Sequence, residues 1–434
     1  MTKLRHVSWP NEQWLKGDLM MQANLATRAL ILLTTAVLTS CSSAAPRWSE
    51  TETLPTDTEG GEVYLRELLP TIVPDIPAPS KLRPCCAFGS GIKVRLGPIP
   101  IPGVMLDNII SPSDVGVHRY DNGLVTFQQQ EDGLRLVQET NGLVYTCRGG
   151  FIDTAHVRDY SDWTTYFAAQ IARSVDTGAV IELPSEGAVR RIHIEPFPPG
   201  LTSLEEIRPA VIALSQYVAF QLSIWHEIST WLGWSSTKAF SEEASAFSPE
   251  DLYSNLLGIK IAGKVIAHQR ASSEQEYDAH VSEVFIKAIN LLGGVEAEAG
   301  RRAAQYVDGV WWQSMKRLPS ADLVLKRNMD TGETIAPWRI SLSHWTAGLE
   351  NAVEQYCGGD ERPVLLTNPS HYRGHALNEF ATLEFILEEA TEKRLPIPLP
   401  EGGVLTHNDF PRLIEAIRKK NDERYGEGAS SPVR

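Results

Sequence analysis

The chain has 434 residues, of which 42% are hydrophobic and 22% are charged, and this composition is typical of a globular protein. Its length predicts either two or three domains or one large domain with insertions. The formal net charge of −14 and the lack of a basic stripe in the sequence argue against nucleic acid as a partner and against docking on anionic lipid by charge alone.

The first 40 residues are interpreted as a signal peptide. Residues 25–41 (LATRALILLTTAVLTSC) contain one arginine, a short apolar run and then small residues. The last four of these resemble a bacterial lipobox, in which the cysteine is acylated and becomes the first residue of the mature chain. We therefore expect Cys41 to carry a lipid. A plain secretory signal or a buried apolar segment are the alternatives, and Met20 or Met21 is a candidate start.

Residues 41–80 are rich in Ser, Thr, Glu and Pro, and we expect them to form a lipid-anchored flexible tether. Two serines and no aspartate follow Cys41, a pattern that predicts an outer-membrane lipoprotein facing the periplasm. No later segment is expected to be apolar for long enough to cross a membrane, so the lipid would be the link to the membrane.

Four more cysteines follow the lipobox, and export to an oxidising compartment predicts up to two disulfides among Cys85, Cys86, Cys147 and Cys357. Four cysteines allow three connectivities. A bridge between the adjacent Cys85 and Cys86 would be strained, so we expect each of them to pair with Cys147 or Cys357. A thiol nucleophile at Cys147 is the alternative, although oxidation would silence it.

Residues 81–147 are expected to form a β-rich, irregular segment. Gly and Pro recur throughout residues 81–104, which excludes a long regular element there. Three short alternating runs between residues 123 and 147 predict a small antiparallel sheet, with Asn-Gly turns at 122–123 and 141–142.

Residues 148–434 are expected to form a mainly helical core domain, so the predicted fold class is α+β, with the small antiparallel sheet as an insertion near the N-terminal side. Two further strands are predicted within residues 178–195. Periodic apolar residues predict helices over residues 152–174, 204–233, 249–269, 274–293, 299–316, 344–357, 375–393 and 409–424.

Three of these helices carry polar residues at positions where apolar ones are expected. Asp153 and His156 lie on one face at the start of the first helix. Glu227 lies in the apolar body of the second, where a charged carboxylate is costly unless it is paired or ligates something. Asp251 and Asn255 share one face of the third. Each residue alone could serve as a cap or a core hydrogen-bonding group, but in a helical bundle they would converge on one site within residues 152–263.

His226 and Glu227 also match the first half of the zinc-protease motif H-E-x-x-H, but a threonine stands in place of the second histidine. A zinc site would need His156 as a second ligand and Glu242 or Glu243 as a third. Because His226 points about 100° away from Glu227 on a helical wheel, we expect His226 to be structural.

Taken together, the three motifs resemble those of the VanZ-like proteins and of the small YfiM-like envelope lipoproteins. The resemblance spans residues 152–263 and rests on Asp153, His156, Glu227, Asp251, Asn255, Gly258 and Gly263. These proteins are grouped with enzymes that act on lipid head groups and lipid-linked envelope precursors. The whole chain also resembles an uncharacterised family of bacterial lipoproteins.

The resemblance implies a hydrolase or transferase that acts on esters or phosphoesters of lipid-linked substrates. We expect His156 to be the nucleophile or general base, oriented by Asp153, with Glu227 as a second acid/base or a metal ligand. Asp251 and Asn255 would bind a divalent cation or the phosphate-bearing substrate. The alternatives are a non-catalytic envelope scaffold or assembly lipoprotein, and a zinc-dependent hydrolase centred on the His-Glu pair.

Overall fold

The computed structural model describes residues of one compact unit, Pro46–Arg434. The described residues are 48, 72–80, 82–83, 87–96, 99–122, 126–130, 133–137, 139–197, 203–236, 241–340, 356–357 and 362–431. The expected signal peptide with Cys41, most of the tether, and the pair Cys85 and Cys86 lie outside the described residues.

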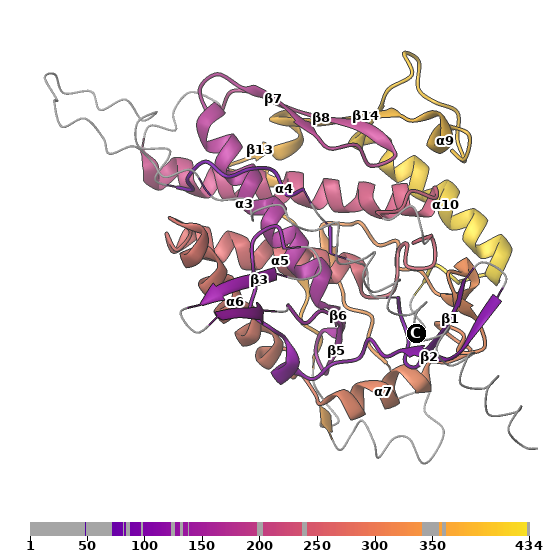
Figure 1. The fold of residues 1–434 in the computed structure, drawn as a ribbon. Coiled ribbons are helices and arrows are strands. Elements are labelled where there is room, and N and C mark those ends of the chain that lie inside the picture. Colours follow the sequence, from indigo (N-terminus) through magenta and orange to yellow (C-terminus); the bar gives the residue numbers. More distant parts are fainter. Residues whose placement is uncertain are drawn as a thin grey trace, which may run out of the picture. The chain divides into compact units, whose positions relative to one another are not determined.

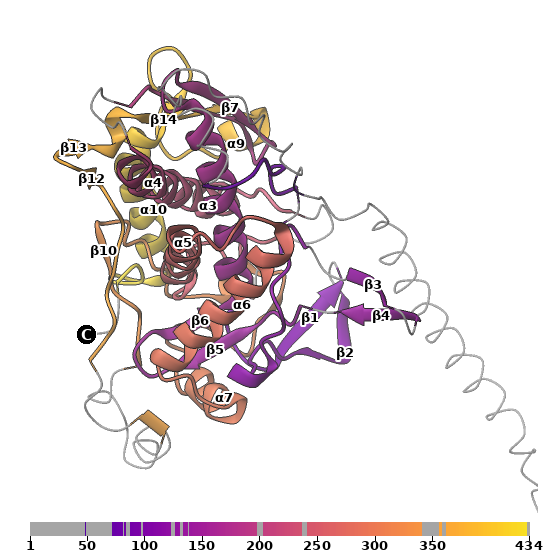
Figure 2. The ribbon, with the colours of Figure 1, turned by 90° about the vertical axis from the view of Figure 1, so that its left-hand side faces the viewer.

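Three largely buried helices, α3, α4 and α5, pack against one another at the centre of this unit (Figure 1). Figure 2 looks nearly along α4 and α5 and shows α3 crossing both. The helices are α3 (Thr154–Ser174), α4 (Leu204–Trp231), α5 (Asp251–Ala267), α6 (Glu274–Leu291), α7 (Ala297–Tyr306), α9 (Glu389–Glu392) and α10 (Phe410–Tyr425). They confirm the helices expected over residues 152–174, 204–233, 249–269, 274–293 and 409–424, and the α+β class is confirmed as well.

A four-stranded antiparallel sheet of order β15-β14-β8-β7 lies against α4 (Figure 1). Trp225 of α4 stacks on Phe385 of β14, with ring centroids 4.3 Å apart. The four strands are β7 (Ala179–Leu183), β8 (Ala188–Ile194), β14 (Ala381–Leu387) and β15 (Leu405–Thr406). The two strands expected within residues 178–195 are therefore confirmed as β7 and β8.

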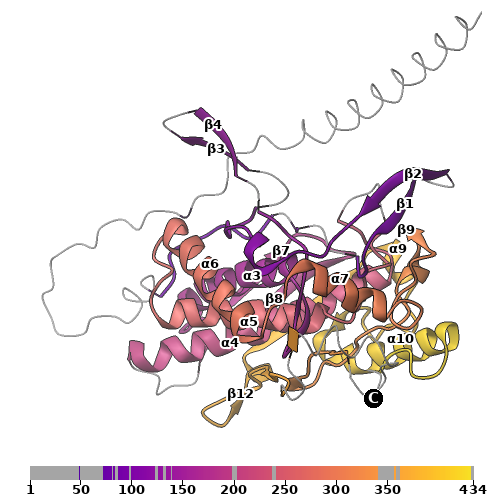
Figure 3. The same cartoon turned by 90° about the horizontal axis from the view of Figure 1, so that it is seen from below.

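The other sheets are small. A three-stranded sheet of order β2-β1-β9 lies beside α7 (Figure 3), where Ile92 and Trp312 belong to a second hydrophobic core. The remaining pairs are two-stranded. These strands are β1 (Ile92–Leu96), β2 (Ile99–Leu106), β3 (Thr126–Gln130), β4 (Gly133–Val137), β5 (Leu143–Thr146), β6 (Gly150–Asp153), β9 (Arg317–Leu318), β10 (Thr334–Ile335), β11 (Leu366–Thr367), β12 (His371–Tyr372) and β13 (His375–Ala376).

The single sheet expected between residues 123 and 147 is wrong in its pairing. β3 and β4 pair as a separate hairpin, whereas β5 pairs with β6, which follows a turn at Gly149 and Gly150. Gly150 has a φ of +67°, and a Cβ at this position would lie 2.2 Å from the backbone oxygen of Trp338. The tight turn before α3 is therefore present, but it leads into a strand that ends at Asp153.

The helix expected over residues 375–393 is also wrong. β14 occupies its middle and pairs with β8 from Ala381 opposite Ile194 to Leu387 opposite Ala188. The alternate residues Ala381, Leu383 and Phe385 are buried, which is the period of a half-buried strand. The helix expected over residues 299–316 ends at Tyr306, before a turn in which Gly309 has a φ of +79°.

A disulfide joins Cys147 to Cys357, with their Cα atoms 5.3 Å apart. The expected pairing of these two cysteines with Cys85 and Cys86 is therefore wrong, and the thiol-nucleophile alternative at Cys147 is also excluded. The bridge ties the end of β5 to a segment 210 positions further along the chain.

One described helix, α4, is long and apolar enough to cross a membrane, contrary to the expectation that no such segment follows the lipobox. However, 72% of its most apolar window is buried among other parts of the chain, as in the core helix of a globular domain.

Candidate functional site

The first part of the candidate site is the start of α3, where β6 ends at Asp153. The Asp153 side chain caps the helix by accepting hydrogen bonds from the backbone NH groups of Ala155 at 2.7 Å and His156 at 3.4 Å. The Asp153 NH donates to Oγ of Ser254 on α5 at 2.9 Å. These contacts hold Asp153 and His156 at the junction of α3 and α5.

Helix α5 approaches both neighbouring helices closely at two glycines. A Cβ at Gly258 would lie 2.0 Å from a backbone oxygen of α3, and a Cβ at Gly263 would lie 1.9 Å from Nε2 of Gln216 on α4. Successive residues of an α-helix are rotated by about 100° about its axis. Asp251 and Asn255 therefore lie on the face of α5 between the side that contacts α3 at Gly258 and the side that contacts α4 at Gly263. They therefore face the junction of α3, α4 and α5.

Helix α4 contributes His226 and Glu227. Oε2 of Glu227 accepts a hydrogen bond from the NH of Phe247 at 2.7 Å, whereas Oε1 has no hydrogen-bond partner among the described residues. The ligand atom of His226, which we expected to be structural, lies within 4.8 Å of those of His156 and Glu227. Glu227 and His226 point in different directions on a helical wheel, but the Glu227 side chain is long enough for its carboxylate to lie near the His226 ring.

His156 belongs to two groups of potential metal ligands. One consists of His156, His226 and Glu227, and the other of Asp153, His156 and Asp251; within each group all ligand atoms lie within 4.8 Å of one another. The ring of His156 pairs with Asp251, whose Oδ1 lies 3.4 Å from Nδ1. Asp251 is thus a second carboxylate beside the ring, in addition to the expected Asp153.

The structure brings the sequence-predicted residues together in a buried environment. Each of the five, Asp153, His156, Glu227, Asp251 and Asn255, is at most 2% exposed. Burial raises the pKa of the Asp251 carboxyl well above its usual range, and the carboxylates of Glu227, Glu250 and Asp153 raise it further. Burial and the neighbouring Asp153 likewise raise the pKa of Glu250. Such perturbed carboxyl groups are common at functional sites.

The sequence did not single out Glu186, which lies in the turn between β7 and β8. Its carboxylate hydrogen-bonds Nδ1 of His226 through Oε1 and pairs with Arg190 through Oε2. Burial lowers the pKa of His226, but the Glu186 carboxylate outweighs this effect and raises it to about 9. Neither Glu186 nor Glu250 shows a local sequence signal, because each reaches the site only through tertiary packing.

The residues proposed as a third zinc ligand, Glu242 and Glu243, have other partners. Glu242 accepts hydrogen bonds from Ser236, and Glu243 pairs with Arg394 at 3.0 Å. Glu227 itself is the carboxylate that completes the group with the two histidines.

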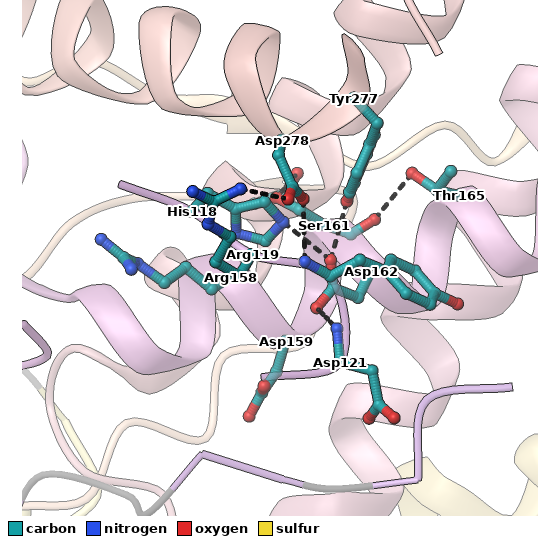
Figure 4. Close-up of polar contacts among 12 residues, drawn as sticks. His118, Arg119, Asp121, Arg158, Asp159, Ser161, Asp162, Thr165, Tyr277 and Asp278 are labelled. Atoms are coloured by element: carbon teal, nitrogen blue, oxygen red, sulfur yellow. Dashed lines mark hydrogen bonds and ion pairs between the residues drawn. The ribbon is translucent and has the colours of Figure 1, made fainter. Parts of the chain in front are cut away.

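A different face of α3 carries a second buried polar network, which is shown in Figure 4. Asp162 accepts a hydrogen bond from the Tyr277 hydroxyl at 2.9 Å, and it pairs with His118 at 2.9 Å and Arg83 at 3.0 Å. Burial raises the pKa of Asp162, but His118 and Arg83 outweigh it, so that the pKa falls below its usual value. Because the Arg83 guanidinium pairs with Asp162, we interpret this network as structural.

The comparisons with known proteins concern most of the described unit. Residues 73–341 match a family described as a protein of unknown function (DUF4056), and this range includes all the candidate site residues of α3, α4 and α5. No curated protein and no solved structure matches the chain. Since the match covers more than half of the 434 residues, the chain belongs to the DUF4056 family.

Proposed function

We propose that the chain is a metal-dependent hydrolase or transferase of the bacterial cell envelope, with its centre at the junction of α3, α4 and α5. The observation that supports this proposal most directly is the group of His156, His226 and Glu227, whose ligand atoms lie within 4.8 Å of one another. Two histidines and one glutamate are a ligand set used by catalytic zinc sites. The polar site on α3, α4 and α5 and the His226–Glu227 zinc motif would thus form one centre.

The hydrogen bond from Glu186 supports a ligand role for His226. A carboxylate on Nδ1 fixes the orientation and tautomer of a histidine that ligates a metal with Nε2. Oε2 of Glu227 is held by a backbone NH, whereas Oε1 has no hydrogen-bond partner among the described residues and is suited to ligation.

The metal bound by His156, His226 and Glu227 and the residues around it would have different roles in the reaction. A divalent cation would supply Lewis acidity toward an ester or phosphoryl oxygen. In the absence of metal, Asp251 holds its proton more tightly than a free aspartate, because burial and the neighbouring carboxylates raise its pKa. Asp251 and Asp153 also keep the His156 ring in place at the start of α3.

The proposed substrate is a lipid head group or a lipid-linked envelope precursor. This part of the proposal rests on the lipobox-like residues before Cys41 and on the resemblance of the three helical motifs to VanZ-like and YfiM-like proteins. Acylation at Cys41 would hold the chain at the outer membrane, on the periplasmic side, next to such substrates. It accords with the Cys147–Cys357 disulfide, because disulfides persist in oxidising compartments.

The competing proposal is a non-catalytic scaffold. It is favoured by the burial of the candidate site residues. All five predicted side chains are at most 2% exposed, so a substrate would need a path that opens to them. Against this alternative, a purely structural network would be expected to satisfy its polar groups, whereas Oε1 of Glu227 and both amide atoms of Asn255 have no hydrogen-bond partner among the described residues.

The test uses the full-length chain purified in detergent. We expect bound Zn²⁺ or Mn²⁺ by elemental analysis and turnover of a phosphate ester or a lipid-linked phosphate. His226→Gln should reduce both by at least about 100-fold, because it removes a ligand of the metal. The matched control is His193→Gln, which changes a half-exposed histidine paired with Glu384 on the sheet and should leave both unchanged. A metal-free and inactive wild-type chain would reject the enzyme in favour of the scaffold.

A further inference from the structure

We infer that a second divalent cation binds next to the first, at oxygen ligands from Asp153, Asp251 and Asn255, so that the centre is dinuclear. This inference rests on the proposed function, because it adds a second cation to the same centre and narrows the substrate class.

The second ligand group shares His156 with the first. Oδ1 of Asp251 is 3.4 Å from Nδ1 of His156, and a ligand atom of Asp153 lies within 4.8 Å of both residues. Nδ1 therefore faces Asp251, and Nε2 is the other nitrogen of the imidazole. His156 can thus ligate the first cation through Nε2 while its Nδ1–H donates to Asp251 beside the second.

Asn255 supplies an independent observation. Its side chain is fully buried, at 0% exposure, and neither its amide oxygen nor its amide nitrogen has a hydrogen-bond partner among the described residues. Burial of a polar group without a partner is unfavourable. Asn255 lies one helical turn after Asp251, on the face of α5 between α3 and α4. An amide oxygen is a ligand that hard divalent cations accept, so a cation beside Asp251 would satisfy it.

The buried charge calls for more than one cation. Four buried carboxylates interact at the centre, namely those of Asp153, Glu227, Glu250 and Asp251. The fifth carboxylate, of Glu186, is matched by Arg190. Metal ligands must be deprotonated, so Asp153, Glu227 and Asp251 would carry three negative charges as ligands, which is more than one divalent cation balances. Unbalanced charge in a buried site is strongly unfavourable.

A pair of cations narrows the substrate class to phosphate esters. Two cations about 3.5–4 Å apart stabilise both the attacking and the leaving oxygen of an in-line displacement at phosphorus. In hydrolysis, a bond forms between phosphorus and the oxygen of water, and the bond between phosphorus and the lipid alcohol oxygen breaks. One proton passes from the water to the departing alcohol, so the reaction needs no further reactant.

The stoichiometry of Mn²⁺ binding tests this inference. Full-length chain in detergent is titrated with Mn²⁺, and bound metal is measured by elemental analysis and electron paramagnetic resonance. The wild type should bind two Mn²⁺ per chain with a spin-coupled signal. Asn255→Leu should bind one and lose the coupling. Asn378→Leu, which changes an exposed asparagine remote in the sequence from the site, is the matched control and should bind two.

The outcomes separate the second cation from the first. If the wild type binds only one Mn²⁺, or if Asn255→Leu still binds two, the second site is wrong and the proposed function stands. If the wild type binds none, both are wrong. If Asn255→Leu does not fold, the stoichiometry and the spin coupling of the wild type decide alone.

Discussion

Nδ1 of His226 hydrogen-bonds the carboxylate of Glu186, forty positions earlier in the chain. Glu186 lies in the β7–β8 turn, and Arg190 on β8 holds its second oxygen. The four-stranded sheet thus supplies the carboxylate that orients a histidine of α4. The site therefore includes the sheet as well as the three helices named by the sequence motifs.

Glu186→Gln should weaken Zn²⁺ binding by about 10–100-fold, since a carboxylate that orients a ligating histidine contributes this much to metal affinity. It should also bring the pKa of His226 down from about 9, because the amide carries no charge. Competition with a zinc chelator measures the affinity. Glu182→Gln is the control, because that exposed residue of the same hairpin pairs only with Arg191 among the described ion pairs. Equal affinities for the two variants would rule out the orienting role.

The metal-free chain should lose stability as the pH rises from about 5 to 9. The folded-state pKa values of Asp251, Glu250 and His226 are all raised, so the folded state holds protons that the unfolded chain has released. The three groups contribute their full stabilisation at a pH below the pKa values that they have in the unfolded chain. This stabilisation is lost as the pH rises through the pKa values that they have in the folded chain. Each group changes the free energy of unfolding by up to about 1.4 kcal/mol per pH unit. Thermal denaturation with a chelator present measures the slope.

Asp251→Asn should flatten this slope because it removes one of the titrating groups, whereas Asp176→Asn, at an exposed turn position, should not. Divalent metal should reverse the trend in the wild type, because its ligands must be deprotonated. A metal-free chain whose stability rises over this range would contradict the prediction.

Gly258→Ala should destabilise the fold by at least about 2 kcal/mol, a typical penalty for overpacking a tight interface. The added Cβ would lie 2.0 Å from a backbone oxygen of α3, and backbone cannot move aside as a flexible side chain can. Chemical denaturation measures the loss. Gly332→Ala is the control, since the nearest atom to its Cβ is a side-chain oxygen at 3.3 Å. A loss no larger than that of the control would show that α5 does not approach α3 this closely.

Reduction of the Cys147–Cys357 bridge should lower the free energy of unfolding by about 3–5 kcal/mol, because the bridge closes a loop with a sequence separation of 210. Peptide mapping without reduction should recover these two cysteines in one linked fragment. A fragment that links Cys147 to Cys85 or Cys86 would show that the pairing is different.

The sequence predicted the three helices that carry the candidate site, because the signals for these helices are local. The apolar period of α3, α4 and α5 defines their faces, and Asp153, Glu227 and Asp251 interrupt those faces. The convergence of these residues follows from packing three such helices together. The proximity of His226 to Glu227 and His156 was not predicted, because a helical wheel gives the direction of a Cβ but not the reach of the side chains.

The rest of the fold depends on contacts that are distant in the sequence. β14 is a strand because it pairs with β8, which lies about 190 positions earlier, and its short alternating pattern alone did not distinguish it from a helix. Glu186 is a charged residue in a turn, where nothing in the local sequence indicates that it is buried against His226. The pairing of the disulfide likewise depends on which cysteines the fold brings together, because the spacing of cysteines in the sequence does not determine their connectivity.

Anomalous X-ray diffraction from crystals of the zinc-loaded chain would locate the metal. We predict an anomalous peak about 2.0–2.2 Å from a nitrogen of His156, a nitrogen of His226 and a carboxylate oxygen of Glu227. A zinc-loaded crystal with no peak among these three side chains, or with peaks only on the surface of the molecule, would contradict the metal centre.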